Sequence, residues 1–158
     1  MTGQLIAAQR PSLWSRVLDT SPDAAPTVAR VMLALVMFPH GAQKLFGWFG
    51  GYGWEGTMGF MTGQIGLPTP LAAGLILLES VGSVLLLLGL LTRPIALGFI
   101  GIMLGAIFSV HAQFGFFMNW SGAQAGEGFE YHLLVIALSI VLVLRGGGRW
   151  ALDRRLAP

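Results

Sequence analysis

Four apolar stretches separated by short polar connections dominate this 158-residue chain. They cover residues 28–48, 71–91, 94–114 and 127–144. A helix needs about 20 apolar residues to span the hydrocarbon core of a bilayer, and it satisfies its backbone hydrogen bonds internally. The pattern therefore predicts an all-α integral membrane protein in which four helices form a bundle.

The fourth stretch is the shortest of the four. Its apolar part, residues 131–144, makes about 21 Å of helix, which is less than the roughly 30 Å of a bilayer core. We therefore expect the helix to begin near Glu127, which would bring Glu130 and His132 into the membrane or its interface.

The basic residues alternate with the four stretches. Of nine Lys and Arg residues, all except Lys44 lie before the first stretch or near its start, in the second connection, or after the fourth stretch: Arg10, Arg16, Arg30, Arg93, Arg145, Arg149, Arg154 and Arg155. Basic residues gather on the cytoplasmic side of membrane proteins. The chain is therefore predicted to cross four times, with both termini cytoplasmic.

Three segments follow from this pattern. Residues 1–25 are predicted to be a cytoplasmic N-terminal tail, residues 26–146 the transmembrane domain, and residues 147–158 a basic cytoplasmic tail. In the first tail, Ser12 precedes an amphipathic stripe and is a candidate helix cap. In the first outer connection, methionines 58 and 61 and Ile65 recur at helical spacing, which predicts a short interfacial helix.

Composition agrees with a membrane protein and excludes several chemistries. The chain is 54% hydrophobic and 10% charged, whereas soluble domains carry about 25% charged residues. A net charge of +2 is too small to indicate a nucleic-acid partner. The chain has no cysteine, so disulfides, thiolate chemistry, Cys-ligated zinc and iron–sulfur clusters are excluded for this chain.

Glu79 lies in the middle of the second apolar stretch. A charged side chain at the centre of a membrane helix costs at least about 2.5 kcal/mol, so it usually faces inward and serves a function. Glu79 shares a helical stripe with Gly82 and Gly89 and should face the bundle. In the third stretch, residues 98, 101 and 105 are also glycines, and we expect these to serve helix packing.

The other ionisable groups of the apolar stretches are predicted to lie in the outer half of the membrane, except Arg30, which is near the cytoplasmic end of the first stretch. His40 and Lys44 share one helix face in the first stretch. We predict Glu79 and His40 as catalytic residues, and as ligand-binding residues Lys44, His111, His132 and Glu130. Four other interpretations remain open: a structural ion pair, a lysine that reaches the headgroups, interfacial histidines, and a solvated Glu130.

Proton-coupled chemistry on a quinone headgroup suits this set of residues. Histidine titrates near neutral pH, and a buried carboxyl can be tuned to exchange protons. Three histidines and two carboxylates could instead hold a metal or haem, but each histidine comes from a different stretch and no HxxxH or HExxH pair occurs. We therefore predict no metal site.

Several short motifs resemble, in order and spacing, the DoxX family of small four-helix membrane proteins over residues 25–155. They are Arg30, the run 40–47 (HGAQKLFG), 67–70 (LPTP), 79–82 (ESVG), 88–93 (LGLLTR), the stretch 111–117, and 146–153 (GGGRWALD). The resemblance implies a bacterial inner-membrane protein. Some relatives are linked to thiosulfate:quinone oxidoreduction and others to oxidative-stress enzymes in a membrane complex. The family's recurrent polar positions would correspond to residues 30, 40, 44, 79, 93 and 111.

Three functions compete on this basis. The leading hypothesis is a redox-linked membrane subunit that interacts with quinone or with a membrane oxidoreductase. The second is a non-enzymatic scaffold that recruits a soluble redox enzyme through its basic tails. The third is a small transporter of anions or organic acids, which would require oligomerisation, because four helices are few for a transporter. The glycine stripes would permit a homo-oligomer.

Overall fold

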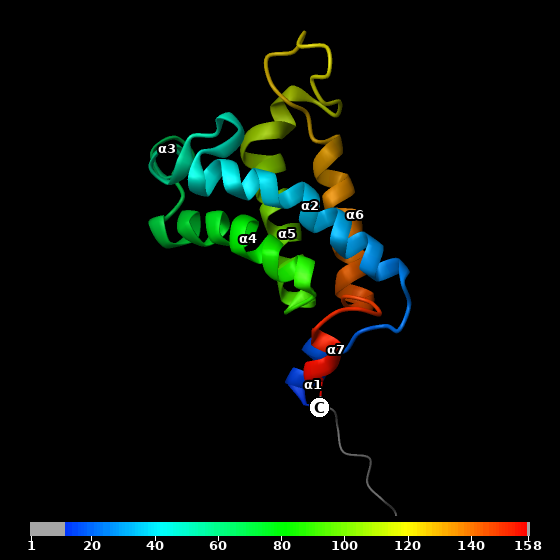
Figure 1. Cartoon of the computed structure of the whole chain (residues 1–158). Helices are drawn as coiled ribbons and strands as arrows, with labels where there is room; N and C mark the ends of the chain where they lie inside the picture. The colour runs from blue at the N-terminus through cyan, green and yellow to red at the C-terminus, as the bar shows by residue number, and fades with distance from the viewer. Residues whose placement is uncertain (1–11, 158) are drawn as a thin grey trace, which may run out of the picture.

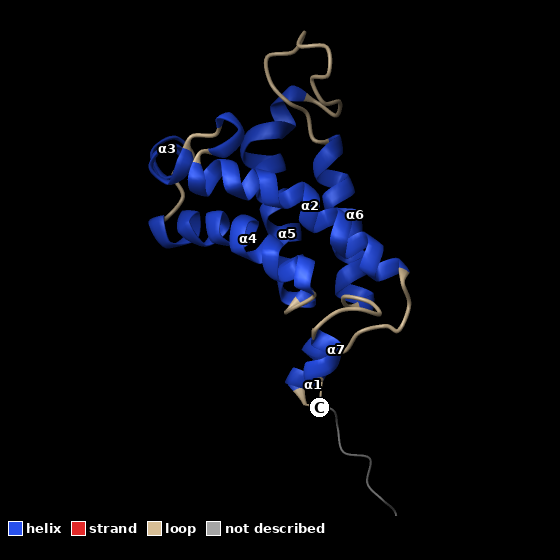
Figure 2. Cartoon of the chain, viewed as in Figure 1, coloured by secondary structure: helices blue, strands red, loops and turns tan. Residues whose placement is uncertain are grey.

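The computed structural model describes residues 12–157, and every regular element within that range is helical (Figure 2). The all-α prediction is confirmed for this part of the chain. Arg10 and the rest of residues 1–11 of the predicted tail lie outside the described residues. Ser12 caps α1 (Leu13–Leu18) as predicted, because its hydroxyl accepts a hydrogen bond of 3.1 Å from the Ser15 amide.

Four long helices form the body of the protein (Figure 1). They are α2 (Ala25–Phe46), α4 (Thr69–Leu88), α5 (Thr92–Ala106) and α6 (Glu130–Arg145). α5 continues as a π-helical turn, η3 (Ile107–His111), and a 3-10 turn, η4 (Ala112–Phe114). The spans Ala25–Phe46, Thr69–Leu88 and Thr92–Phe114 are long and apolar enough to cross a membrane.

The fourth long helix begins later than the sequence pattern predicted. α6 starts at Glu130 rather than near Glu127, because residues 115–129 form a loop that returns to the helix through hydrogen bonds from the amides of Phe129 and Glu130 to the Phe116 carbonyl. Its 16 residues make about 24 Å of helix. That α6 crosses the membrane stays a prediction.

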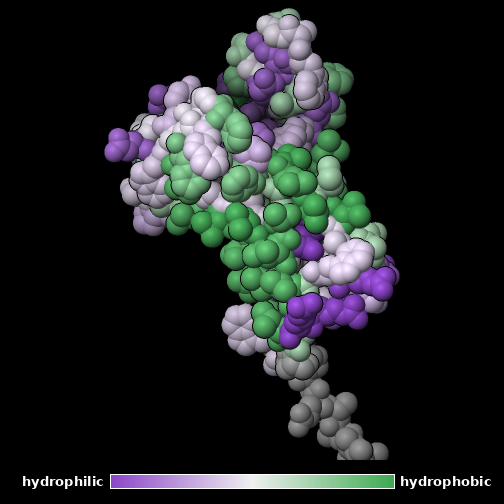
Figure 3. Space-filling view, in the orientation of Figure 1, coloured by the Kyte–Doolittle hydropathy of each residue, from purple (hydrophilic) through white to green (hydrophobic). Residues whose placement is uncertain are grey.

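The long helices contact one another in a closed ring: α2 packs against α4 and α6, and α5 packs against the same two helices. Their shared core is apolar and fully buried, with Leu33, Met37, Leu86, Phe99 and Leu142 at its centre. Other large apolar side chains are exposed on the outside of the same helices. Figure 3 shows them as an apolar band between two more polar ends, the surface expected for contact with lipid.

Short helices fill the first outer connection. After η1 (Trp48–Gly50) come α3 (Gly53–Gly59) and the π-helical turn η2 (Phe60–Gln64). The prediction of a short helix in this connection is confirmed. It packs against α2 and α4, and Met61 is buried there with Ala72 and Ile76.

The opposite end of the bundle is held by buried polar contacts. Arg30 donates from Nε to the carbonyl of Gly147 and from Nη1 to the carbonyls of Leu86 and Leu87, at the end of α4. Asp153, the first residue of α7 (Asp153–Leu156), accepts hydrogen bonds from the amides of Leu91 and Thr92 and so caps α5. These contacts fix the C-terminal segment to the turn between α4 and α5.

Arg93 connects the same turn to two other segments. Its guanidinium donates to the carbonyls of Asp19 and Val143 and forms an ion pair of 3.4 Å with the Asp19 carboxylate. Arg93 and Arg30 therefore lie at the same end of the molecule, next to the turn between α4 and α5. Which side of the membrane this end faces stays a prediction.

Candidate functional site

A cavity of about 820 Å³ lies among α2, α4, α5, α6 and the first outer connection. Its volume is within the usual range of small-molecule sites. The polar lining comes from residues predicted from the sequence and from three that were not, which are Ser109, Glu127 and Tyr131. The predicted ones are His40, Lys44, Glu79, His111 and His132. Most of the remaining wall is apolar, with leucines 71, 75 and 78 on α4 and Met103 on α5.

Gly41 brings two of these polar residues together. A Cβ at this position would overlap the backbone of Glu79 and Ser80, so only glycine lets α2 and α4 cross this closely. Lys44 follows three residues later on the same face of α2. The crossing therefore places the Lys44 ammonium against the Glu79 carboxylate.

Lys44 and Glu79 form an ion pair in which Nζ donates to Oε2. The Glu79 side chain is 4% exposed and that of Lys44 is 28% exposed. Glu79 thus faces inward, as predicted, and Lys44 points to Glu79 instead of outward to the headgroups. Because a pair in low dielectric gives up much of its hydration, its net effect on stability is small although breaking it is costly.

His40 lies one turn before Lys44 and faces the cavity. Its ring is 5.6 Å from that of Tyr131 on α6, centroid to centroid. The Tyr131 hydroxyl is 3.5 Å from the Met37 sulfur. Tyr131 could not be selected from the sequence, because its aromatic ring suited an interfacial position equally well.

Two histidines meet at the outer part of the cavity. The rings of His111 and His132 are 4.2 Å apart, centroid to centroid. His132 is only 6% exposed, and its Nδ1 has no hydrogen-bond partner among the described residues. His111 Nδ1 lies 2.8 Å from the Glu127 carbonyl oxygen. An unpartnered buried ring nitrogen that lines a cavity is available to a ligand or to water.

Glu130 differs from the other predicted residues because it does not line the cavity. Its carboxylate accepts hydrogen bonds from the Met118 amide at 2.9 Å and from the Trp120 indole at 3.2 Å, and so it holds the loop before α6. Glu127 lines the cavity instead. Glu127 contacts His111 there through its backbone carbonyl, whereas its carboxylate accepts from the Asn119 amide, and sequence spacing could not predict this loop conformation.

The glycines of α5 do not serve helix packing throughout, contrary to expectation. Gly98 is in close contact with Leu78 of α4, but a Cβ at Gly101 or Gly105 would meet nothing within 4 Å. Both glycines line the cavity and are exposed at its edge. Because no neighbouring atom covers either position, these glycines border an opening of the cavity.

A metal centre has little support in this geometry. Within residues 12–157, no group of three or more His, Asp or Glu side chains is arranged to hold a metal ion. Near His111 and His132, Glu127 presents its backbone carbonyl to the His111 ring. Its carboxylate accepts a hydrogen bond from the Asn119 amide instead.

Comparison with known proteins identifies the family. The DoxX family model matches residues 25–112, from the start of α2 to the first residue of η4. The chain belongs to the DoxX family. A relative in Bacillus subtilis (strain 168), named Putative oxidoreductase CatD, is 32% identical over 136 residues, which cover 86% of this chain and 90% of the relative.

A second DoxX-type relative is the Inner membrane protein YphA of Escherichia coli (strain K12), 28% identical over 133 residues, with 81% of this chain and 87% of the relative covered. No solved structure matches the chain. The region matched by the family model contains His40, Lys44 and Glu79 together with the α5 glycines, whereas Tyr131 and His132 lie beyond it. The apolar helices and these relatives establish a DoxX-family membrane protein.

Proposed function

We propose that this DoxX-family protein is a redox-linked subunit of the bacterial inner membrane that binds a quinone in the cavity among α2, α4, α5 and α6. Glu79 and His40 exchange protons with the quinone headgroup. The observation that carries the proposal is the amphipathic cavity itself, in which a buried ion pair and histidines adjoin a long apolar wall.

The shape and polarity of the cavity suit such a ligand. A quinone has a planar headgroup with two carbonyl oxygens and an apolar tail. Lys44 and His40 supply donors near the headgroup, while the leucines of α4 offer an apolar surface to the tail. Small-molecule sites usually have a mostly apolar wall with a small number of polar groups.

The opening at Gly101 and Gly105 supports entry from the bilayer. Both glycines lie on the exposed face of a span, next to the large apolar side chains Leu97 and Leu104. A ligand dissolved in the hydrocarbon core reaches this opening without passing through water. Because glycine has no side chain, the edge of α5 leaves room for a tail that extends from the cavity into lipid.

The reaction is the reduction of a quinone by two electrons and two protons to a quinol. A partner oxidoreductase supplies the two electrons, since the chain has no cysteine to pass them on. The protons reach the two carbonyl oxygens through the Glu79 carboxyl and the His40 imidazole. His132 and His111, whose tilted rings lie 4.2 Å apart, carry the protons from the aqueous phase to this part of the cavity.

The names of the relatives agree with this direction. The first relative is named Putative oxidoreductase CatD, and the second Inner membrane protein YphA. An anion transporter has less support, because the positive charge of Lys44 is already paired with Glu79. The ion pair does not argue against a scaffold role. A scaffold that recruits a redox enzyme is compatible with the redox proposal, because that proposal also requires a partner enzyme.

Quinone binding by the purified protein tests the proposal. Decylubiquinone should quench the intrinsic tryptophan fluorescence of the wild type in detergent in a saturable manner. Glu79→Gln and His40→Ala should weaken binding by about tenfold or more, which corresponds to at least about 1.4 kcal/mol, while the protein stays folded. Glu55→Gln is the matched control, because Glu55 is exposed and does not line the cavity. Equal affinity in the wild type and all three variants would contradict the proposal.

A further inference from the structure

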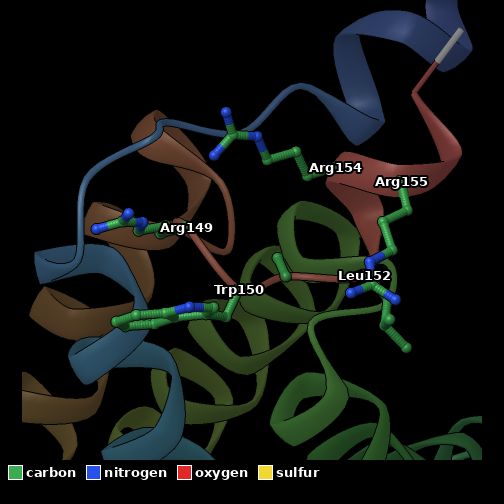
Figure 4. Close-up of a pocket in the computed structure, with 6 residues that line it drawn as sticks. Arg149, Trp150, Leu152, Arg154 and Arg155 are labelled. Carbon is green, nitrogen blue, oxygen red and sulfur yellow. The ribbon is translucent and has the colours of Figure 1, made fainter.

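Three guanidinium groups and an indole surround a second, shallow cavity of about 290 Å³ at the C-terminal end of the chain (Figure 4). Arg154 and Arg155 extend from α7, whereas Arg149 and Trp150 come from the preceding loop. The volume is at the low end of the range for ligand sites. We call these four residues the C-terminal basic cluster.

The positive charge of this cluster is not neutralised by the described part of the protein. Asp153 is the carboxylate nearest in sequence, but it is 1% exposed and is engaged with the amides of Leu91 and Thr92. Among residues 12–157, no carboxylate lies within 4.0 Å of the guanidinium groups of the cluster. Asp153 therefore adds no negative charge to the outer face of the cluster. The exposed Asp23, whose carbonyl accepts a hydrogen bond of 3.0 Å from the Arg149 amide, accepts from the Ser21 hydroxyl with its carboxylate and forms no ion pair with the cluster.

Apolar side chains next to the cluster are also exposed. Trp150 is 64% exposed, and the Arg149 guanidinium lies 5.6 Å from the centroid of its ring. α1 packs beside α7 and leaves Leu13 and Trp14 81% and 66% exposed. Exposed tryptophan beside arginine, at the end of membrane-spanning helices, is typical of the headgroup level of a bilayer.

We propose that the C-terminal basic cluster binds the phosphodiester headgroup of an anionic phospholipid. Guanidinium groups donate two parallel hydrogen bonds to phosphate oxygens, and basic pockets at the ends of membrane helices bind anionic headgroups. The indole of Trp150 covers the glycerol region, and the apolar side chains of α1 contact the upper acyl chains. The proposal is independent of the quinone site.

The position of the cluster favours a lipid over a protein partner. It adjoins the turn between α4 and α5, to which Asp153 fixes it, and so it lies where two apolar spans end. Phosphates of the surrounding leaflet are already at this level. A soluble protein would have to cover exposed Trp14 and Trp150 against competition from the bilayer.

Native mass spectrometry of the full chain, released from detergent and titrated with single phospholipids, tests the proposal. Wild-type protein should bind phosphatidylglycerol or cardiolipin at least about tenfold more tightly than phosphatidylethanolamine. Arg149→Gln, and separately Arg154→Gln with Arg155→Gln, should remove that preference. Arg145→Gln removes the same single charge as Arg149→Gln from an exposed position that does not line the cavity, and it should retain the preference. All variants should unfold at the wild-type temperature.

Three results would overturn the proposal. The first is an equal preference for anionic lipid in the wild type and all variants. The second is equal binding of inorganic phosphate and phospholipid, which would indicate a site for free anions. The third is a co-purifying protein that the Arg149→Gln variant loses while lipid binding is unchanged.

Discussion

Lys44 and Glu79 illustrate how one buried ion pair limits what single substitutions can show. Each charge stabilises the other in a place where water is scarce, so removing one leaves the other without compensation. Gln at position 79 retains a hydrogen-bond acceptor for Lys44 and changes mainly the charge. An apolar residue at position 79 removes both, and its effect on stability is therefore larger.

This difference gives a prediction at the residue scale. Glu79→Leu should lower the free energy of unfolding by about 3 kcal/mol, because it leaves a largely buried ammonium unpaired. Lys44→Met combined with Glu79→Leu should recover most of that loss, because the pair is then replaced by apolar side chains of similar volume. Denaturant unfolding in detergent micelles, followed by circular dichroism, measures both. A double variant no more stable than Glu79→Leu alone would contradict the ion-pair interpretation.

At the scale of the elements, α5 has two different faces within one helix. Its buried face contributes Phe99 and Ile102 to the core, whereas Gly101 and Gly105 border the cavity opening. The helix is held at its start by the Asp153 cap. Substitutions at the open glycines therefore change the volume available to a ligand rather than the packing of the bundle.

Gly101→Leu and Gly105→Leu should each abolish saturable decylubiquinone binding, because the new side chain fills the space at the opening. Their unfolding temperatures should stay within a few degrees of the wild type. Gly74→Leu is the matched control, because a Cβ there also meets nothing within 4 Å and Gly74 does not line the cavity. Loss of binding in the control, or full binding in the α5 variants, would argue against an opening at these glycines.

The sequence was sufficient to predict the long helices but only part of the site. Continuous apolar runs determine where α2, α4 and α5 lie, and Glu79 could be assigned an inward position from its stripe. The role of the α5 glycines could not be predicted, because the same spacing serves close packing or an open edge. The outcome depends on how close α4 lies to α5 at each glycine: Leu78 of α4 is against Gly98, whereas nothing lies within 4 Å of a Cβ at Gly101 or Gly105.

At the scale of the whole molecule, the distribution of arginines predicts four crossings with both termini cytoplasmic. The absence of cysteine makes this simple to test, since a single introduced thiol has no background. Ser121→Cys, in the exposed loop before α6, should react with a membrane-impermeant maleimide in intact spheroplasts. Ala157→Cys, at the other end, should react only after permeabilisation. Labelling of both in intact spheroplasts would place them on the same side and so exclude the single crossing by α6 that is predicted between them.

The pairing of Lys44 with Glu79 also has an electrical consequence. The two opposite charges cancel, so this ion pair adds no net charge to the cavity within the transmembrane field. Moving one elementary charge through 100 mV involves about 2.3 kcal/mol, but an uncharged ligand that docks beside a neutral pair moves none. Its affinity should therefore be the same in an energised and a de-energised cell, and occupancy would follow the size of the ligand pool alone.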